Sequence, residues 1–192
     1  MKETLKLGLI LLVFALVAAG VLGYVNSVTE PIIAEREARE AQEAYQELIP
    51  EADEFVEFTS EELNKYKAIN SKVTSIVKAI KGGDEIGYLL TTNGGGYGGD
   101  ITVITALIGD EIKAIKILKH KETPEIGTKV VENKDFEAQY SGKSVREPIA
   151  VKKENPGASE IQAISGSTVS SRGVTDAVNI ALDIYKELNN GL

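Results

Sequence analysis

An uncharged run between Lys6 and Glu30 limits what this chain can fold into more than any other feature of its 192 residues. Most of the run, from Leu7 to Tyr24, is almost wholly leucine, valine, isoleucine, alanine, glycine and phenylalanine. As a helix rising about 1.5 Å per residue, the run would reach about 34 Å, and the hydrocarbon core of a bilayer is about 30 Å thick. We therefore expect residues 1–29 to form a retained transmembrane anchor.

A cleaved signal peptide is the alternative interpretation of this run. Lys2 and Lys6 form a basic n-region and Val17-Ala18-Ala19 supplies small residues, although the run is longer than a usual signal-peptide core. Arg36 and Arg39 on the far flank weaken the orientation signal of the positive-inside rule. We expect a single pass through the inner or plasma membrane, with a cytoplasmic N-terminus and the rest of the chain on the extracytoplasmic side.

A juxtamembrane helix is predicted over residues 30–50, with Thr29 as its cap and Pro31 in its first turn. Its apolar stripe is short and mostly alanine, which favours a solvated stalk docked on its own domain over a coiled coil with a partner. The stripe consists of Ala34, Ala38, Ala41, Tyr45 and Leu48.

Residues 51–192 are predicted to form one extracytoplasmic domain that begins with an antiparallel sheet. Its strands are β-rich runs separated by glycine-containing turns, at Val73–Ile80, Glu85–Thr92, Ile101–Ile108 and Glu111–Leu118. In the last run we place Ile112 and Ala114 on one face and Ile115 and Ile117 on the other, so both faces are expected to be partly covered.

A helix is predicted at the C-terminus, ending by Asn189–Gly191, and we expect it to lie across the sheet. Its apolar residues keep three-four spacing, at Val174, Ala177, Val178, Ala181, Leu182, Tyr185 and Leu188. Because strands and helices segregate along the sequence, the expected fold class is α+β.

Composition excludes several kinds of function. The formal net charge of −8 argues against nucleic acid as a partner, since phosphate binding needs a basic face. The chain has no cysteine and a single histidine, so we expect no disulfide, no iron–sulfur cluster and no zinc site. Any redox chemistry would need an organic cofactor.

Three segments are candidates for a functional site. Asn93–Asp100 holds five glycines around Tyr97; it is either a wide turn or a loop whose N–H groups approach a ligand closely. His120–Gly127 contains the lone histidine, ordinarily a solvated strand-end residue, but Glu122 and Thr123 are able to hydrogen-bond a polar ring edge.

The third segment, Ile164–Gly173, is a hydroxyl-rich turn before the last helix. As a helix cap it would use Ser170 or Ser171. As a phosphate site it would use the first helical N–H groups and the positive end of the helix dipole, with Arg172 assisting. The residues leave both interpretations open, and the GxSxG spacing of a nucleophilic serine is absent, so no catalytic residue is predicted.

Together these segments resemble the FMN-binding domain family, typified by the RnfG and RsxG subunits of Rnf electron-transport complexes and by the related NqrC protein. The resemblance covers nearly the whole chain. It rests on the anchor, the Thr-x-Pro step at 29–31, Gly-Tyr-Gly-Gly at 96–99, His-x-Glu-Thr-Pro at 120–124 and Ser-Gly-Ser-Thr at 165–168. The length of the chain favours the Rnf-type subunit.

The resemblance implies a covalent FMN, joined by a phosphoester to Thr168 after a flavin transferase moves the FMN moiety from FAD. By position, the turn and the phosphate contacts would come from Ser165, Gly166, Ser167, Val169 and Ser170. The contacts to the flavin ring would come from His120, Glu122, Thr123, Ile126 and Gly127, with Tyr97 and Gly98 nearby. The chain departs from the family pattern at Ser167, Glu125 and Gln162, where alanine, glycine and aspartate are usual.

The function implied is that of an electron-transfer subunit in a membrane complex that couples electron flow between ferredoxin and NAD to sodium or proton transport. Its partners would be the other membrane subunits of the Rnf-type complex, and it would have no activity alone. Two alternatives remain open: a flavinylated subunit of another chain, such as an NqrC-like or extracellular electron-transfer system, or an envelope scaffold without flavin in which Ser165–Thr168 is only a helix cap.

Overall fold

The computed structural model describes residues 2–125 and 127–190. The chain divides into two compact units, Met1–Gln42 and Glu43–Leu192.

One continuous helix, α1 (Lys2–Leu48), forms the first unit and continues into the start of the second. The predicted helix start at Thr29 is wrong, because Thr29 lies inside α1 and its hydroxyl donates to the Val25 carbonyl at 2.9 Å. Pro31 is also internal; it removes one backbone hydrogen bond, and the neighbouring Ser27 hydroxyl donates back to the Tyr24 carbonyl at 2.8 Å. The hydroxyls near the proline thus bond within one helix and do not cap a second one.

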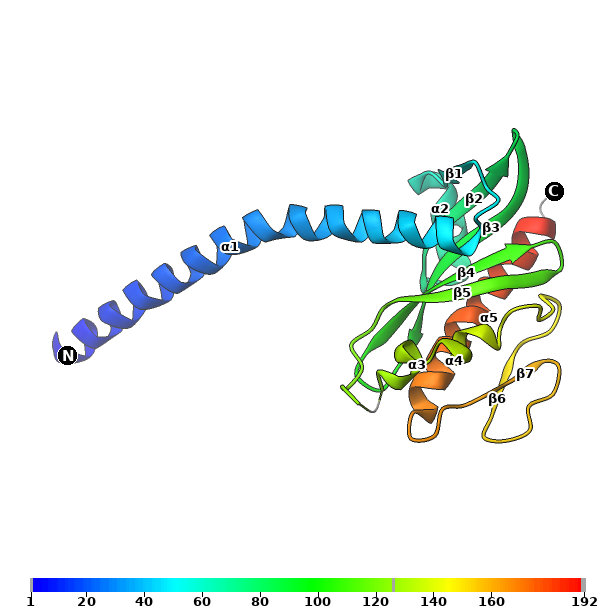
Figure 1. Ribbon diagram of the computed structural model, residues 1–192. Helices are drawn as coiled ribbons and strands as arrows, with labels where there is room; N and C mark the ends of the chain where they lie inside the picture. The colour runs from blue at the N-terminus through cyan, green and yellow to red at the C-terminus, as the bar shows by residue number, and fades with distance from the viewer. Residues whose placement is uncertain (1, 126, 191–192) are drawn as a thin grey trace. The chain divides into compact units, whose positions relative to one another are not determined.

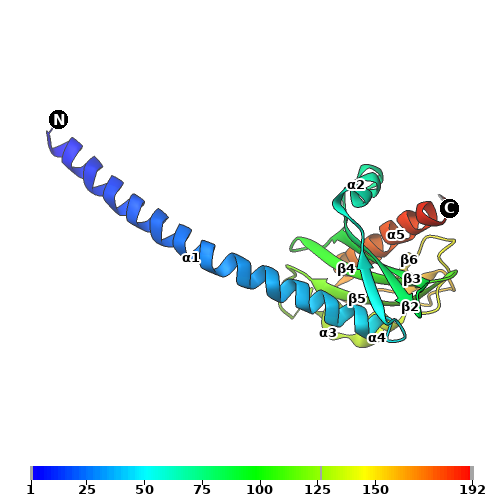
Figure 2. The same ribbon diagram turned by 90° about the horizontal axis from the view of Figure 1, so that it is seen from above.

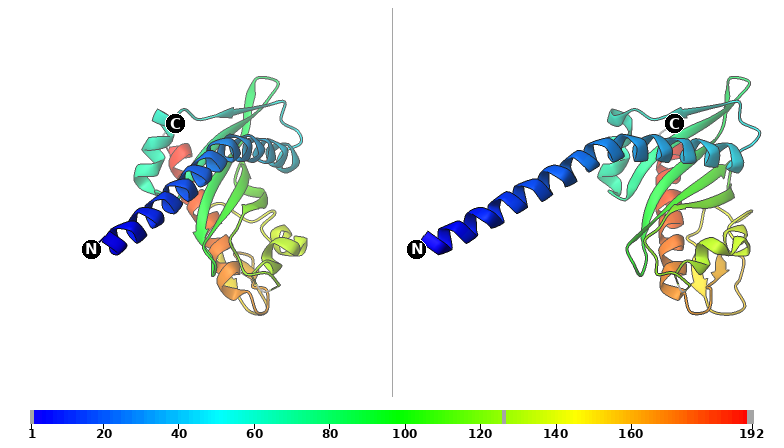
Figure 3. Two further views of the ribbon diagram at one scale, coloured as in Figure 1. Left: turned by 90° about the vertical axis from the view of Figure 1, so that its left-hand side faces the viewer. Right: turned by 60° about the vertical axis from the view of Figure 1, so that its left-hand side comes forward.

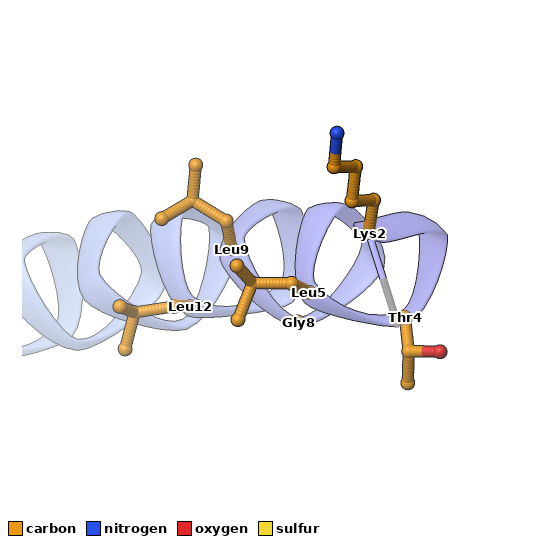
Figure 4. Close-up of a pocket in the computed structure, with 6 residues that line it drawn as sticks. All are labelled: Lys2, Thr4, Leu5, Gly8, Leu9 and Leu12. Atoms are coloured by element: carbon orange, nitrogen blue, oxygen red, sulfur yellow. The ribbon is translucent and has the colours of Figure 1, made fainter.

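The first half of α1 is a candidate transmembrane helix. An 18-residue window within it has a mean hydropathy of 2.6 and none of that window is buried, a combination that no other helix among the described residues has. Figure 4 shows the first turns, where Leu5, Leu9 and Leu12 extend outward from the helix. The helix therefore presents apolar side chains on its surface, as a lipid-facing helix does.

A five-stranded antiparallel sheet forms the centre of the second unit (Figure 1). Its strands lie in sequence order: β1 (Glu54–Glu57), β2 (Val73–Lys81), β3 (Asp84–Gly95), β4 (Asp100–Ile108) and β5 (Glu111–Lys119). The four predicted strands are confirmed, and β1 is a short strand that was not predicted from the sequence.

Strand β5 contains a bulge that corrects its predicted faces. Ala106 pairs with Ala114 but Leu107 pairs with Ile112, so Lys113 is an extra residue on β5. The alternation therefore breaks after Ile112, which lies on the same face as Ile115, while Ala114 lies on the opposite face. The expectation that both faces are covered is confirmed.

Each face of the sheet packs against helical residues. Helix α5 (Thr168–Asn190) covers one face, as Figures 2 and 3 show, and all seven predicted apolar residues of this helix are buried there. The opposite face packs against the last turn of α1 and the residues after it, Ala44, Leu48, Ile49 and Ala52. The α+β class is confirmed.

The remaining elements are short. They are α2 (Ser60–Ile69), α3 (Lys129–Glu132), α4 (Lys134–Ala138) and a parallel ribbon of β6 (Ala150–Lys152) and β7 (Glu160–Gln162). Helix α4 protects the outer edge of β5, because the Ile117 N–H donates to the Glu137 carboxylate at 2.9 Å. Helices α3 and α4 and the ribbon lie near the first turns of α5 (Figure 1).

Candidate functional site

The three candidate segments meet at one pocket of about 510 Å³, at the start of α5. Its size falls within the range of about 300–1,000 Å³ that is usual for small-molecule sites. The residues that line it are Tyr97, Glu122, Thr123, Gly127, Gly166, Ser167, Thr168, Val169 and Ser170. Nine residues predicted for the site from three separate stretches of sequence are therefore brought together.

The hydroxyl-rich turn ends where α5 begins, at Thr168. The Ser167 carbonyl accepts the Ser171 N–H at 2.8 Å, which makes Ser167 the residue immediately before the helix. The predicted cap at Ser170 or Ser171 is wrong, because both serines lie in the first turn. The chain enters the helix earlier than expected, after Gly166 turns it at a φ of 83°.

Three backbone N–H groups at this helix start stand outside the helix bonding pattern. In an α-helix the N–H groups of the first turn have no helical carbonyl four residues earlier, and in α5 these are the N–H groups of Thr168, Val169 and Ser170. They coincide with the positive end of the α5 dipole, an arrangement that binds phosphate groups in many folds. The Thr168 side chain lies at the same place, partly exposed and lining the pocket.

Glu122 is buried at the back of the pocket, with 6% of its surface exposed. Its carboxylate accepts a hydrogen bond from the Gly98 N–H at 3.2 Å and one from the Ser170 hydroxyl at 2.7 Å. Its two oxygens thus bind the glycine loop and the start of α5, and the flavin contact that the resemblance implies for Glu122 stays a prediction.

The glycine run is partly strand and partly loop. Asn93, Gly94 and Gly95 belong to β3, and only residues 96–99 form the loop, closed by the Gly96 N–H donating to the Gly99 carbonyl at 2.8 Å. A Cβ on Gly94 would lie 1.8 Å from the carbonyl oxygen of Gly173 in α5. Gly173 was not predicted as important, although a glycine inside an amphipathic helix is a usual sign of close packing.

Two exposed apolar side chains form the rim of the pocket. Tyr97 is 76% exposed and Val169 is 50% exposed, and they come from the glycine loop and the first turn of α5. An aromatic and a branched aliphatic side chain beside a set of phosphate-binding N–H groups suit a ligand that combines a flat ring system with a phosphate.

His120 lies at a different hollow, lined by Asp100, Thr102, Leu118, Lys119 and Lys121 as well. Its Nδ1 accepts the Glu122 N–H at 3.3 Å, so the ring helps to shape the turn that carries Glu122. Ser165 and Gly98 flank the pocket without lining it. Ile126 was also predicted to contact the ring, and it lies outside the described residues.

The structure describes the surroundings of the three residues that depart from the family pattern, Glu125, Gln162 and Ser167. Glu125 has a φ of 64°, in the left-handed region that favours glycine, the residue usual at this position in the family it resembles. Gln162 lies on β7, where its side chain donates to the Lys153 carbonyl at 3.1 Å. Ser167 is buried.

A metal centre is not a candidate here. Within residues 2–125 and 127–190, no group of three or more histidine or acidic side chains is arranged to hold an ion.

Comparison with known proteins agrees with this geometry. The FMN-binding domain matches residues 96–183, which contain the second and third segments whole and the first from Gly96 onward, and the RnfG N-terminal region matches residues 1–48. A protein of Acetobacterium woodii, the G subunit of its Na(+)-translocating ferredoxin:NAD(+) oxidoreductase complex, is 34% identical across 98% of this chain and 94% of the relative. The G subunit of the ion-translocating oxidoreductase complex of Methanosarcina acetivorans is 28% identical, across 95% of this chain and 94% of the relative.

Two solved structures share the fold. The crystal structure of Shewanella oneidensis NqrC superposes with a TM-score of 0.51 at 15% identity, covering 72% of this chain and 82% of that chain. The corresponding protein of the Na(+)-translocating NADH-quinone reductase from Parabacteroides distasonis gives 0.53 at 18% identity, covering 75% and 81%. With a relative 34% identical over almost its whole length, the chain belongs to the RnfG family of FMN-binding domain proteins.

Proposed function

We propose that this chain is the covalently flavinylated electron-transfer subunit of an Rnf-type membrane complex, with FMN joined to Thr168. The relatives from Acetobacterium woodii and Methanosarcina acetivorans are named as subunits of ion-translocating oxidoreductase complexes, the first of them acting between ferredoxin and NAD(+). The other membrane subunits of such a complex would be the partners of this chain.

The observation that carries the proposal is the position of Thr168. Its hydroxyl stands in the first turn of α5, beside the first N–H groups of that helix and inside a pocket with an apolar rim. A phosphoester on that hydroxyl would lie next to donors suited to its oxygens, and the ring would have the rim to pack on. The residues present therefore fit FMN.

Attachment is a phosphoryl transfer carried out by a separate flavin transferase. The Thr168 oxygen forms a bond to the FMN-side phosphorus of FAD, the bond from that phosphorus to the bridging oxygen breaks, and AMP leaves while the hydroxyl proton is lost. When bound, the flavin supplies the one-electron and two-electron redox chemistry that the side chains of this protein lack. Covalent attachment keeps the cofactor with the domain even when no free FMN surrounds it.

Placement in the cell is proposed from α1. Residues 1–29 cross the membrane once, residues 30–50 form the juxtamembrane part, which is helical as far as Leu48, and residues 51–192 stand on the extracytoplasmic side. The exposed apolar surface of the first half of α1 supports the crossing. A protease added to intact cells or spheroplasts should digest the domain from residue 51 onward if it faces outward.

The decisive experiment weighs the protein after expression with a flavin transferase. The intact mass should rise by one FMN less one water, and peptide mapping should place the increment on Thr168. Thr168→Val, which keeps the shape without the hydroxyl, should be unmodified and folded, and Thr168→Ser should be modified. An unmodified natural protein, or full modification of Thr168→Val, would overturn the proposal.

The same variants separate a flavin carrier from a scaffold in which the turn is only a helix cap. Since Ser167 precedes the helix, loss of the Thr168 hydroxyl should change the free energy of unfolding by no more than about 0.5 kcal/mol. Loss of flavin with no loss of stability is expected for an acceptor residue.

A further inference from the structure

Glu122 joins three separate stretches of the chain. It belongs to the segment after β5, and its carboxylate bonds Gly98, 24 residues earlier, and Ser170, 48 residues later. Because Ser170 is two residues beyond Thr168, this carboxylate fixes the turn of α5 that carries the proposed flavin acceptor.

The surrounding backbone leaves room for the carboxylate on two sides. A Cβ on Gly96 would lie 2.0 Å from Glu122 Oε1, and a Cβ on Gly127 would lie 2.2 Å from Oε2. Real Cβ atoms are not found at such distances. The two glycines thus enclose the carboxylate closely, and the position of Glu122 is set by the backbone on both sides of it.

The Glu122 carboxylate is held by hydrogen bonds. Among the described residues, none of the ion pairs within 4.0 Å includes Glu122, and its stabilisation comes from the Gly98 N–H, the Ser170 hydroxyl and the positive end of the α5 dipole. A buried carboxylate held in this way is expensive, since its desolvation is repaid only by good hydrogen-bond geometry. A neutral residue would fill a purely structural role with a smaller loss of solvation free energy.

We infer that Glu122 is a positioning residue for the flavin site: it locks the glycine loop and the first turn of α5 together before the cofactor arrives. The pocket is consequently formed in the protein without flavin, and the transferase meets Thr168 in a fixed position. After attachment, the same buried negative charge lines the pocket and disfavours the gain of negative charge by the flavin on reduction. This inference rests on the proposed attachment of FMN at Thr168.

The test compares four variants with the natural protein. Glu122→Ala removes both hydrogen bonds, Glu122→Gln keeps an oxygen acceptor for Gly98 but removes the charge, and Ser170→Ala removes one bond only. Glu125→Gln is the matched control, since it removes an exposed charge three residues away in the same segment. Each protein is purified without flavin, and its folding is checked by circular dichroism and thermal unfolding.

The first readout is the rate at which a flavin transferase modifies the folded, flavin-free protein. Glu122→Ala should slow the reaction by about tenfold or more, because misplacement of a reacting group by about 1 Å costs up to a hundredfold. Ser170→Ala should slow it less. Glu122→Gln should recover most of the rate, and Glu125→Gln should match the natural protein.

Two further readouts respond to positioning and charge separately. Amide hydrogen exchange of residues 96–99 and 168–171 should be faster in Glu122→Ala before any flavin is attached. The reduction potential of the attached flavin should be higher in Glu122→Gln than in Glu125→Gln, a change that a merely structural residue would not produce.

The outcomes distinguish this inference from the proposed function. If the natural protein acquires no FMN on Thr168, the proposed function fails. A second outcome is that the natural protein acquires FMN while Glu122→Ala, shown to be folded, is modified at the same rate and has unchanged amide hydrogen exchange. In that case the positioning role is wrong and the proposed function stands. Should Glu122→Ala fail to fold, Ser170→Ala decides, and a natural rate together with natural exchange in that variant would overturn the inference.

Discussion

Two glycine-rich connections of the same sheet use glycine for different physical reasons. In the β2–β3 turn, Gly82 and Gly83 have φ angles of 61° and 91°, and a Cβ on either would meet no atom within 4 Å. In the β3–β4 connection, Gly94 and Gly96 have no positive φ, but a Cβ on them would lie 1.8 and 2.0 Å from other atoms. Gly82 and Gly83 are needed for the backbone angle, whereas Gly94 and Gly96 are needed for the missing side chain.

This difference separates a turn that only reverses the chain from a loop that builds a site. Close approach at Gly94 lets α5 pack directly on β3, and close approach at Gly96 leaves space for the Glu122 carboxylate. Both approaches position the first turn of α5. The effects of substitutions at the two connections should therefore differ in their physical cause as well as in their size.

The largest effect is expected for Gly94→Ala. The new Cβ would overlap the Gly173 carbonyl, which is backbone and has no freedom to rotate away. Separation of α5 from β3 should lower the free energy of unfolding by about 3 kcal/mol or more, at the upper end of overpacking costs. Urea unfolding monitored by circular dichroism measures this, and a loss below that of Gly82→Ala would contradict the close-approach interpretation.

Gly127→Ala is expected to be next, at about 2 kcal/mol. All three atoms nearest to its new Cβ belong to the Glu122 side chain, at 2.2, 2.7 and 3.1 Å. The double variant Glu122→Ala/Gly127→Ala should be more stable than the sum of the two single losses predicts, because the side chain in the way is gone. Additive losses in that double-mutant cycle would show that the two residues do not interact.

Gly82→Ala should have a smaller effect and leave the flavin unaffected. Alanine at a φ of 61° costs about 1 kcal/mol, and its side chain would point into open space. The intact mass after incubation with the transferase should equal that of the natural protein. Reduced flavin attachment in this variant would mean that the two connections are not independent.

The smallest effect, and the only gain, is expected for Glu125→Gly. Glu125 adopts a φ of 64° with an exposed side chain, so glycine would relieve backbone strain at the end of the segment that carries Glu122. The free energy of unfolding should rise by no more than about 1 kcal/mol, since glycine also gains entropy in the unfolded chain. A lower melting temperature than that of the natural protein would show that the backbone at Glu125 is not strained.

Much of the fold could be predicted because its main elements are periodic. The apolar residues from Val174 to Leu188 keep helical spacing because they are buried against the sheet. The β-rich runs from Val73 onward form that sheet and contribute to the same core. Helix α2 could also have been found, since Thr59 and Glu62 form a capping box whose spacing is visible in the sequence. The bulge at Lys113 could not, because it depends on how β5 pairs with β4.

The candidate site was predictable in its members and less so in its contacts. The three segments were identified by residue type, and the pocket unites them. The bond between Glu122 and Ser170 joins residues 48 positions apart, so no local pattern reveals it. No local pattern reveals the location of His120 either. It is adjacent to the site in sequence but lines another hollow, because the chain turns between it and Glu122.

The contact between Ser170 and Glu122 has a consequence for quality control in the cell. It can form only when α5 lies on the sheet and the segment following β5 is in its final place, since Glu122 and Ser170 are 48 residues apart. If the transferase requires the position that this contact gives to Thr168, only completed domains receive a flavin. The yellow colour of a molecule would then be a permanent record that its domain had once folded correctly.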